Sequence, residues 1–114
     1  MSDITSPSDI FDFLAKAKNL LSVGKFTFIN RRKNLQALAQ NGLTLADAKD
    51  EILDLVVNDY YDGPKQDYDT NQPGDIWIFR KIIDDKIFYI KLKINMENSD
   101  DILKCISFHV DEFS

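Results

Sequence analysis

The sequence has little of several residue types, and each shortage excludes a class of protein. Cys105 is the single cysteine, so neither an intramolecular disulfide nor a cysteine-rich metal site can form. With four glycines, three prolines and 44% hydrophobic residues, the composition is that of a globular chain. No apolar run approaches the roughly 20 residues that cross a membrane. Residues 1–4 lack the basic and apolar regions of a signal peptide, so we expect a soluble protein of the cytoplasm.

Charge and length narrow the possibilities further. The 14 Lys and Arg residues are outnumbered by 19 Asp and Glu residues, which gives a formal net charge of −5. An acidic total argues against a protein that coats nucleic acid, but it leaves room for a local basic site. The 114 residues are long enough for one core, so we expect a single domain over residues 1–114, with a flexible N-terminus at residues 1–5.

Helical signals fill the first half of the chain. Ser6 can cap a helix over about 7–23, with Pro7 at its first position. A short extended segment follows, and Asn30 can then cap a second helix that runs to Gln40. Thr44 opens a third helix with a capping box. Its expected buried stripe consists of Leu45, Ala48, Ile52, Leu55 and Val56.

The second half of the chain is expected to form strands. Gly-Pro and Pro-Gly pairs predict a long loop over 58–75. Strands are predicted at 76–83, 86–94 and 102–110, and Asp84-Asp85 makes a tight turn between the first two. Helices followed by successive strands predict an α+β domain, with N-terminal helices packed on one face of an antiparallel sheet.

The strand at 86–94 alternates with period two, with Ile87 at the start of its polar face, which is typical of a half-buried strand. The expected core face of this strand consists of Phe88, Ile90, Leu92 and Ile94. The open face then carries Tyr89, Lys91 and Lys93. In the last strand, alternation places Ile102, Lys104, Ile106, Phe108 and Val110 on one face. The other face carries Leu103, Cys105, Ser107 and His109, so Ser107 and His109 are expected to share the open face with Tyr89 and the lysines.

These open-face residues are candidates for catalysis on a phosphodiester. His109, the sole histidine, can exchange protons near neutral pH, and the lysines can neutralise charge that develops on a phosphate. Cleavage of RNA without a metal needs a base for the ribose 2′-hydroxyl, an acid for the leaving oxygen and cations. A lone histidine at a strand end can equally be structural or merely exposed.

A basic cluster opens the predicted second helix. Arg31, Arg32 and Lys33 have the wrong sign for the positive end of a helix dipole, and a cationic first turn with free N–H groups attracts anions. The alternative is a solvated surface cluster. Asp67, Asp69 and Asn71 begin like a calcium loop, but its twelfth position would be Ile78, so no metal or other cofactor is predicted.

The succession of motifs along the chain resembles the MqsR family of bacterial toxins, which are mRNA interferases of toxin–antitoxin pairs. The resemblance covers the chain from about residue 9 to its end. The motifs that carry it are Gly42-Leu43-Thr44, Asp59-Tyr60-Tyr61-Asp62-Gly63-Pro64, Ile76-Trp77, Tyr89-Ile90-Lys91-Leu92-Lys93-Ile94 and Ile106-Ser107-Phe108-His109.

The resemblance implies a RelE-like fold with a curved antiparallel sheet, sequence-selective cleavage of single-stranded mRNA, and a partner antitoxin. It implies catalytic roles for Tyr89, Lys91 and His109, where better-known members carry lysine at the last position. The substrate-binding residues expected from the motifs, the open face and the basic cluster are Tyr60, Tyr61, Trp77, Lys93, Arg31, Arg32 and Lys33. We expect no membrane association and no DNA binding by the chain itself.

Two other hypotheses remain open. The same face can bind RNA or a protein without cleaving it. Asp62 and Ile78 favour this alternative, because they stand where better-known members carry lysine and glutamine. The chain can also be a remnant that folds but has lost its activity.

Overall fold

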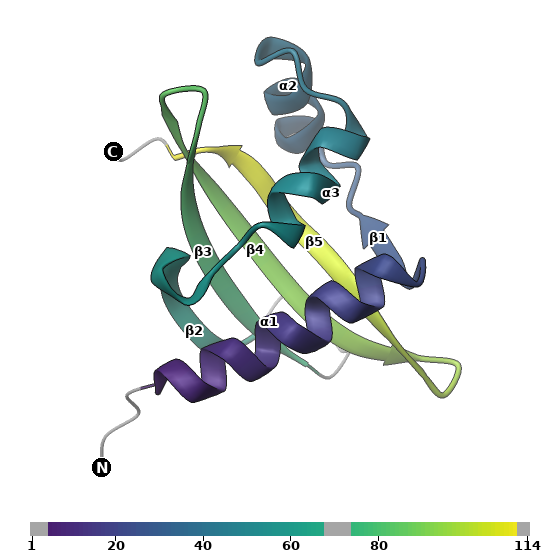
Figure 1. The fold of residues 1–114 in the computed structure, drawn as a ribbon. Coiled ribbons are helices and arrows are strands. Elements are labelled where there is room, and N and C mark those ends of the chain that lie inside the picture. The colour runs from purple at the N-terminus through teal and green to yellow at the C-terminus, as the bar shows by residue number, and fades with distance from the viewer. Residues whose placement is uncertain (1–4, 68–73, 112–114) are drawn as a thin grey trace.

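The computed structural model describes residues 5–67 and 74–111 of the chain. Over these ranges it is an α+β fold in which helices lie against a five-stranded sheet (Figure 1). In chain order the elements are α1 (Pro7–Ser22), β1 (Phe26–Phe28), α2 (Arg32–Gln40), α3 (Leu45–Leu53), the 3-10 helix η1 (Val57–Asp59), β2 (Tyr60–Gln66), β3 (Asp75–Ile83), β4 (Lys86–Glu97) and β5 (Asp100–Val110). The predicted α+β class is therefore confirmed.

The sheet is open and mixed, with strand order β1-β5-β4-β3-β2. The pairs from β2 to β5 are antiparallel, but β1 pairs parallel to β5, with Phe26 opposite Leu103 and Phe28 opposite Cys105. The prediction of a wholly antiparallel sheet is thus wrong at this edge. A hairpin turn forces the two strands that it joins to be antiparallel. Most of the chain separates β1 from β5, so the direction of β1 relative to β5 is not restricted in this way.

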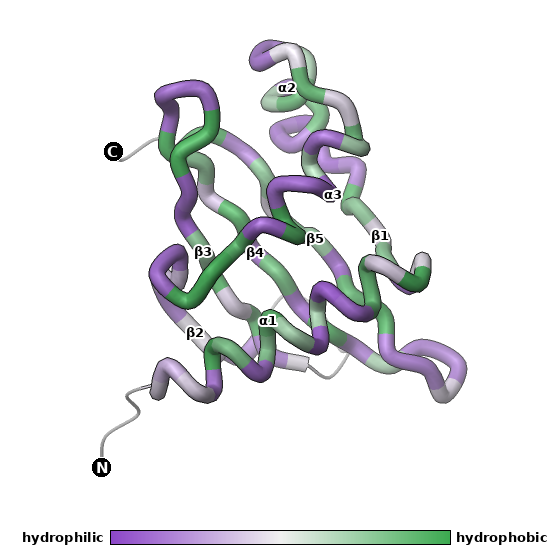
Figure 2. Tube along the Cα trace, viewed as in Figure 1, coloured by the Kyte–Doolittle hydropathy of each residue, from purple (hydrophilic) through white to green (hydrophobic). Residues whose placement is uncertain are grey.

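The core lies between the sheet and the helix layer. Figure 1 shows α1 crossing one face of the sheet, and Figure 2 shows apolar and polar residues alternating along the strands. Phe88, Ile90 and Leu92 of β4 are fully buried there, as predicted, and Phe79 of β3 joins them. Burial of this apolar surface supplies the main stabilisation of the fold.

A β-bulge in β5 changes the alternation of that strand. Lys91 and Leu92 are adjacent in β4, but their partners Ser107 and Cys105 lie two residues apart, so Ile106 is an extra residue. A bulge of this kind moves every side chain before it to the opposite face of the strand.

The face assignment of β5 is therefore correct after the bulge and wrong before it. Leu103 and Cys105 were expected on the open face, and both are fully buried in the core. Lys104 was expected on the core face, and it instead lies directly opposite Lys93 across the sheet. Burial raises the pKa of the Cys105 thiol, which makes this side chain unreactive.

Two helix starts follow the sequence signals. The Ser6 side chain accepts a hydrogen bond from the Asp9 amide (3.1 Å) at the start of α1. Thr44 and Asp47 form the predicted capping box at α3, with bonds of 3.1 and 2.8 Å. Of the predicted flexible N-terminus, residues 1–4 lie outside the described residues. Thr5 donates a hydrogen bond from its hydroxyl to the carbonyl of Gly63 (2.7 Å).

The start of α2 differs from the prediction. Arg31 occupies the N-cap position and makes no side-chain capping bond, so the assignment of Asn30 is wrong. The Arg31 amide donates to the carbonyl of Ile29 (2.8 Å), and this tight turn shifts the helix start by one residue. The first turn of α2 therefore lacks the usual side-chain cap.

The buried stripe of α3 is shorter than predicted. Ala48, Ile52 and Leu55 are buried, but Leu45 is 43% exposed and Val56 is 53% exposed. The helix ends before Val56, so the helical period no longer directs that side chain inward.

The predicted loop over 58–75 contains an edge strand, β2, that sequence reasoning missed. Proline is tolerated at a sheet edge, so Pro64 does not end the strand. Gly63 has φ +111°, and a Cβ there would lie 2.5 Å from the carbonyl oxygen of Ile76, so glycine permits an irregular pairing rather than a turn. Residues 68–73, which complete the predicted loop, lie outside the described residues.

Both hairpin turns use residues with positive φ. Asp84 and Asp85 have φ of 50° and 67°, which matches the predicted tight turn between β3 and β4. Asn98 and Ser99 make the turn between β4 and β5, and both strands are longer than predicted. In the part of the chain that the structure describes, no helix is long and apolar enough to span a membrane.

Candidate functional site

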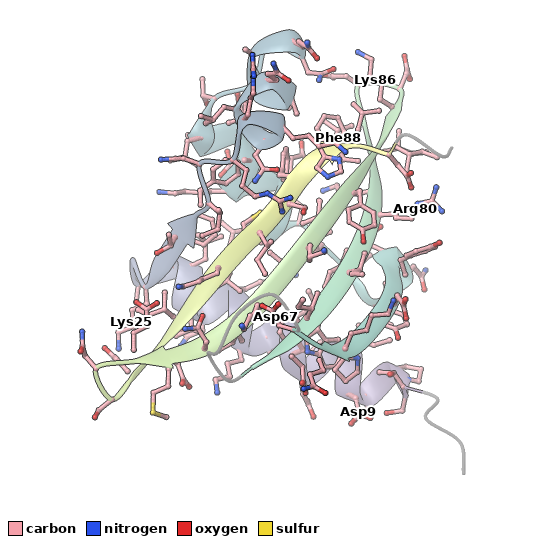
Figure 3. All side chains as sticks on the ribbon, turned by 180° about the vertical axis from the view of Figure 1, so that it is seen from behind. Asp9, Lys25, Asp67, Arg80, Lys86 and Phe88 are labelled. Carbon is pink, nitrogen blue, oxygen red and sulfur yellow. The ribbon has the colours of Figure 1, made fainter. Side chains whose placement is uncertain are left out.

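Tyr89 and Lys91 alternate along β4 with buried residues of the core, so they lie on the face of the sheet away from α1 and α3, which is the face seen in Figure 3. Tyr89 of β4 lies opposite His109 of β5, and Lys91 lies opposite Ser107. The rings of Tyr89 and His109 stack with centroids 5.6 Å apart and planes 19° apart. The Lys91 ammonium lies 6.0 Å from the centroid of the Tyr89 ring. The sheet register therefore brings the phenol, the imidazole and the ammonium into one group, as predicted.

These residues line a cleft of about 450 Å³. We call it the sheet cleft and define it by its lining residues Arg31, Lys33, Tyr61, Asp62, Lys65, Ile78, Tyr89, Lys91, Ser107, His109 and Asp111. Three elements outside the central strands contribute to it: the start of α2, the edge strand β2 and the segment just after β5. A ligand in this cleft would contact Tyr89, Lys91 and His109 together with the basic start of α2.

Asn34 fixes α2 beside the cleft. Its side chain is 1% exposed, and its Nδ2 donates to the carbonyls of Ile29 (3.0 Å) and Ile106 (2.9 Å). Its Oδ1 accepts from the amide of Phe108 (3.0 Å). A fully bonded buried amide is a strong positional constraint, since its loss would leave the buried amide of Phe108 without its acceptor. The basic first turn of α2 is thereby held at the rim of the sheet cleft.

A backbone carbonyl lies within hydrogen-bond distance of the His109 ring. The carbonyl oxygen of Val110 lies 3.1 Å from the Nδ1 atom of His109, and a carbonyl can only accept. This contact favours the tautomer of the neutral ring that carries its proton on Nδ1 and its lone pair on Nε2. A neutral imidazole held in this way can take a proton through Nε2.

The environment keeps Tyr89 protonated. Partial burial raises the pKa of the Tyr89 phenol, and nearby Lys65 opposes this by lowering it. A phenol with a raised pKa remains a hydrogen-bond donor throughout the physiological range. Tyr89 is thus suited to donate to an anionic oxygen rather than to act as a base.

The lining of the sheet cleft is locally basic. It carries four cationic side chains, from Arg31, Lys33, Lys65 and Lys91, and two carboxylates, from Asp62 and Asp111. This excess of cations contrasts with the net charge of −5 on the whole chain. The predicted local basic site therefore exists on a protein that is acidic overall.

Each carboxylate of the cleft has a basic partner. Lys65 lies 2.6 Å from Asp62, and this hydrogen bond lowers the pKa of the Asp62 carboxyl. The Asp111 carboxylate lies 2.7 Å from Nε of Arg80. The Arg80 guanidinium also lies 4.9 Å from the centroid of the Tyr61 ring. These contacts hold the rim of the cleft in place.

Some predicted substrate-binding residues are not brought to the sheet cleft. Lys93 is 2% exposed, and its ammonium forms an ion pair with Asp67 at 2.8 Å. Trp77 stacks on Phe13 of α1 at 4.5 Å, and Tyr60 packs edge-on against Trp77, so both lie on the helix-covered face. Arg32 faces an adjacent groove rather than the cleft. Of the remaining residues, Arg31, Lys33 and Tyr61 line the cleft.

Sequence reasoning missed several residues of the site. Lys65 fell in the predicted loop, and recognising β2 as a strand would have placed it beside the open face. Asp111 directly follows the last strand, so its position could have been inferred from the alternation that correctly placed His109. No sequence signal identified the anchoring role of Asn34, because its bonds join residues far apart in the chain.

The chain has no match among protein-family models, curated proteins or solved structures. In the ranges 5–67 and 74–111, no group of three or more His, Cys, Asp or Glu side chains is placed to hold a metal ion. The function of the sheet cleft must therefore be argued from its own geometry and chemistry.

Proposed function

We propose that the chain is an endoribonuclease that cleaves single-stranded mRNA in the sheet cleft without a metal ion. The observation that carries this proposal is the stacked pair of His109 and Tyr89 beside Lys91, in a basic cleft on an acidic protein. The grouping matches the roles that the MqsR resemblance implies for these three residues. We propose, on the same resemblance, that the α+β fold is RelE-like.

The proposed reaction is attack of the ribose 2′-hydroxyl on the adjacent phosphorus. Nε2 of His109 takes the proton of the 2′-hydroxyl as the bond from O2′ to phosphorus forms. The bond from phosphorus to O5′ breaks, and the Lys91 ammonium gives the departing oxygen its proton. Tyr89 donates a hydrogen bond to a phosphate oxygen, while Arg31 and Lys33 neutralise the charge. The products are a 2′,3′-cyclic phosphate and a 5′-hydroxyl.

Purified protein and a labelled, unstructured RNA test the activity in the presence of EDTA. We expect the wild-type chain to cut the RNA, and His109→Ala and Lys91→Met to lose about a hundredfold or more in rate, as removal of an acid–base group typically costs. Lys49→Met is the matched control, since Lys49 is an exposed lysine of α3 on the helix side. Equal rates for wild type and His109→Ala would contradict the proposal.

The biological role that we propose is that of a toxin acting in the cytoplasm, paired with an antitoxin protein. Expression of the wild type should arrest growth and fragment mRNA, and His109→Ala should restore growth. Growth arrest with intact transcripts would contradict the nuclease role. A small antitoxin gene directly beside the coding sequence, whose product relieves the arrest, would support the pairing.

One observation favours a second function, binding without cleavage. Asp62 places a carboxylate in the lining of the sheet cleft, where it opposes an approaching phosphate and engages the ammonium of Lys65 at 2.6 Å. A protein- or RNA-binding module with this cleft would retain RNA without cutting it. RNA that is bound yet remains whole after long incubation, in EDTA or with Mg²⁺, would select this function over the nuclease.

A further inference from the structure

A second groove, of about 570 Å³, lies between α2 and the end of β5. We call it the α2 groove, and the lining residues that matter here are Arg32, Lys33, Gln36, Gln40 and His109. Lys33 and His109 line the sheet cleft as well. The α2 groove and the sheet cleft therefore meet at the imidazole of His109, and an extended polymer bound in one can continue into the other.

The α2 groove differs from the sheet cleft in its charge. Its described lining contains Arg32, Lys33 and His109 but no carboxylate, whereas Asp62 and Asp111 both line the sheet cleft. On a chain with a net charge of −5, a hollow lined by cations without carboxylates is suited to an anion. Its remaining polar lining is neutral and consists of side-chain amides.

The amides are arranged along one face of the helix. Lys33, Gln36 and Gln40 follow one another at intervals of three and four residues, so they project from α2 on the same side. Each glutamine amide offers both donors and acceptors, which are the groups that pair with the edges of unstacked bases in single-stranded RNA. Binding of phosphate alone would require only the cationic side chains of the groove, so the glutamine amides favour a ligand that also carries bases.

The helix that carries these amides is tied down at both ends. Asn34 joins its first turn to β5, and at its other end the Lys86 ammonium donates to Oδ1 of Asn41 (2.7 Å). The Nδ2 of Asn41 in turn donates to the carbonyl of Ala37 (2.7 Å). A groove with a fixed wall can select among ligands at little cost in lost conformational freedom.

We infer that the α2 groove binds the nucleotides that flank the scissile phosphate on one side, with Gln36 and Gln40 contacting base edges and Arg32 a backbone phosphate. This subsite rests on the proposed nuclease function, because it assigns to RNA the path that leads away from His109. The subsite adds contacts to RNA outside the sheet cleft, so affinity should depend on the number of nucleotides in the substrate.

Binding of uncleavable RNA tests the subsite separately from catalysis. The probes are fluorescent 2′-O-methyl oligoribonucleotides of random sequence, three or six nucleotides long, titrated with the full chain. We expect the six-nucleotide pool to bind more tightly than the three-nucleotide pool. Replacing both Gln36 and Gln40 by alanine should weaken binding of the longer pool by about fivefold or more, as the loss of two neutral hydrogen bonds predicts. Binding of the shorter pool should stay unchanged.

Two further variants sharpen the test. Arg32→Gln should lower the slope of log affinity against log salt by about 0.7 for the longer pool, as loss of one phosphate contact on a single strand predicts. Gln66→Ala is the matched control, since Gln66 is an exposed glutamine of β2 outside both hollows. It should behave as wild type with both pools.

Three outcomes would overturn the subsite. The first is equal affinity of the wild type for the two pools, and the second is an equal loss of affinity for both pools in the double glutamine variant. The third is competition by polyglutamate that is as strong as competition by RNA, which would make the groove a general anion site. Failure of the nuclease proposal gives a different result, in which natural RNA stays uncut while the length-dependent, glutamine-dependent binding persists.

Discussion

The side-chain amide of Asn34 bonds to the backbone of β5 on both sides of Ser107. It donates to the carbonyl of Ile106 at 2.9 Å and accepts from the amide of Phe108 at 3.0 Å. The short strand β1 pairs with β5 only as far as Cys105, so beyond that point the amide of Asn34 satisfies backbone groups as a neighbouring strand would. One residue of α2 thus continues the edge of the sheet and fixes the helix beside the cleft.

Replacing Asn34 tests this role. Asn34→Ala should lower the free energy of unfolding by about 1–3 kcal/mol, because it leaves the buried amide of Phe108 without an acceptor. Asn30→Ala, at the exposed position that the sequence suggested as the helix cap, should change it by less than about 0.5 kcal/mol. Urea unfolding of both variants checks the pair. An equal effect of the two substitutions would contradict the anchoring role.

The buried ion pair of Lys93 with Asp67 gives a second prediction. Lys93→Met leaves the Asp67 carboxylate buried without its ammonium, and it should cost about 3 kcal/mol of stability or more. The double variant Lys93→Met with Asp67→Leu should recover most of this loss, because both charges are then gone. Thermal or urea unfolding measures the difference. If the double variant is no more stable than Lys93→Met alone, the ion pair does not have the assigned role.

The limits of sequence reasoning show most clearly in β4 and β5. Period-two alternation placed Tyr89 and Lys91 correctly, because the extra residue of the bulge lies in β5 and not in β4. Alternation failed for Cys105, because the extra residue Ile106 reverses the faces, and no local signal in the sequence marks the bulge. His109 was placed correctly because it follows the bulge and is in phase with Tyr89.

Other failures came from reading local signals without their tertiary context. Gly63 and Pro64 are strong turn formers, yet at the sheet edge they belong to β2. Lys93 shares a face with Lys91, but the sequence could not show that Asp67 would cover it with an opposite charge. Capping signals at Ser6 and Thr44 were reliable because a cap depends only on residues within one turn.

Alkaline unfolding tests the environment of Tyr89. Its pKa is raised in the folded state by burial, so the folded chain holds the phenolic proton to higher pH than the unfolded chain. The stability that this provides is present below the unfolded pKa of about 10 and is lost as pH rises through the folded pKa. Wild type should therefore lose more unfolding free energy than Tyr89→Phe between about pH 9 and 11. Parallel pH profiles of the two proteins would contradict the raised pKa.

The two faces of the sheet give opposite predictions for aromatic residues. Tyr61→Ala should weaken binding of single-stranded RNA by about tenfold, through loss of a stacking surface at the cleft, and Tyr61→Phe should retain binding. Trp77→Phe should reduce stability through its contact with Phe13 but leave RNA affinity unchanged. Fluorescence anisotropy with unfolding curves separates the effects. If Trp77→Phe weakens RNA binding more than Tyr61→Ala does, the RNA binds on the helix-covered face of the sheet, which would contradict the account.

Single-turnover cleavage of a defined RNA, with its product ends identified, tests the central claim most directly. The substrate is compared with the same oligonucleotide carrying one 2′-deoxyribose at the mapped cleavage position, in EDTA, for wild type and His109→Ala. A catalytic group of His109, Tyr89 and Lys91 predicts a 2′,3′-cyclic phosphate from wild type, no cut at the deoxy position and little product from His109→Ala. A cut at the deoxy position, or undiminished cleavage by His109→Ala, would contradict it.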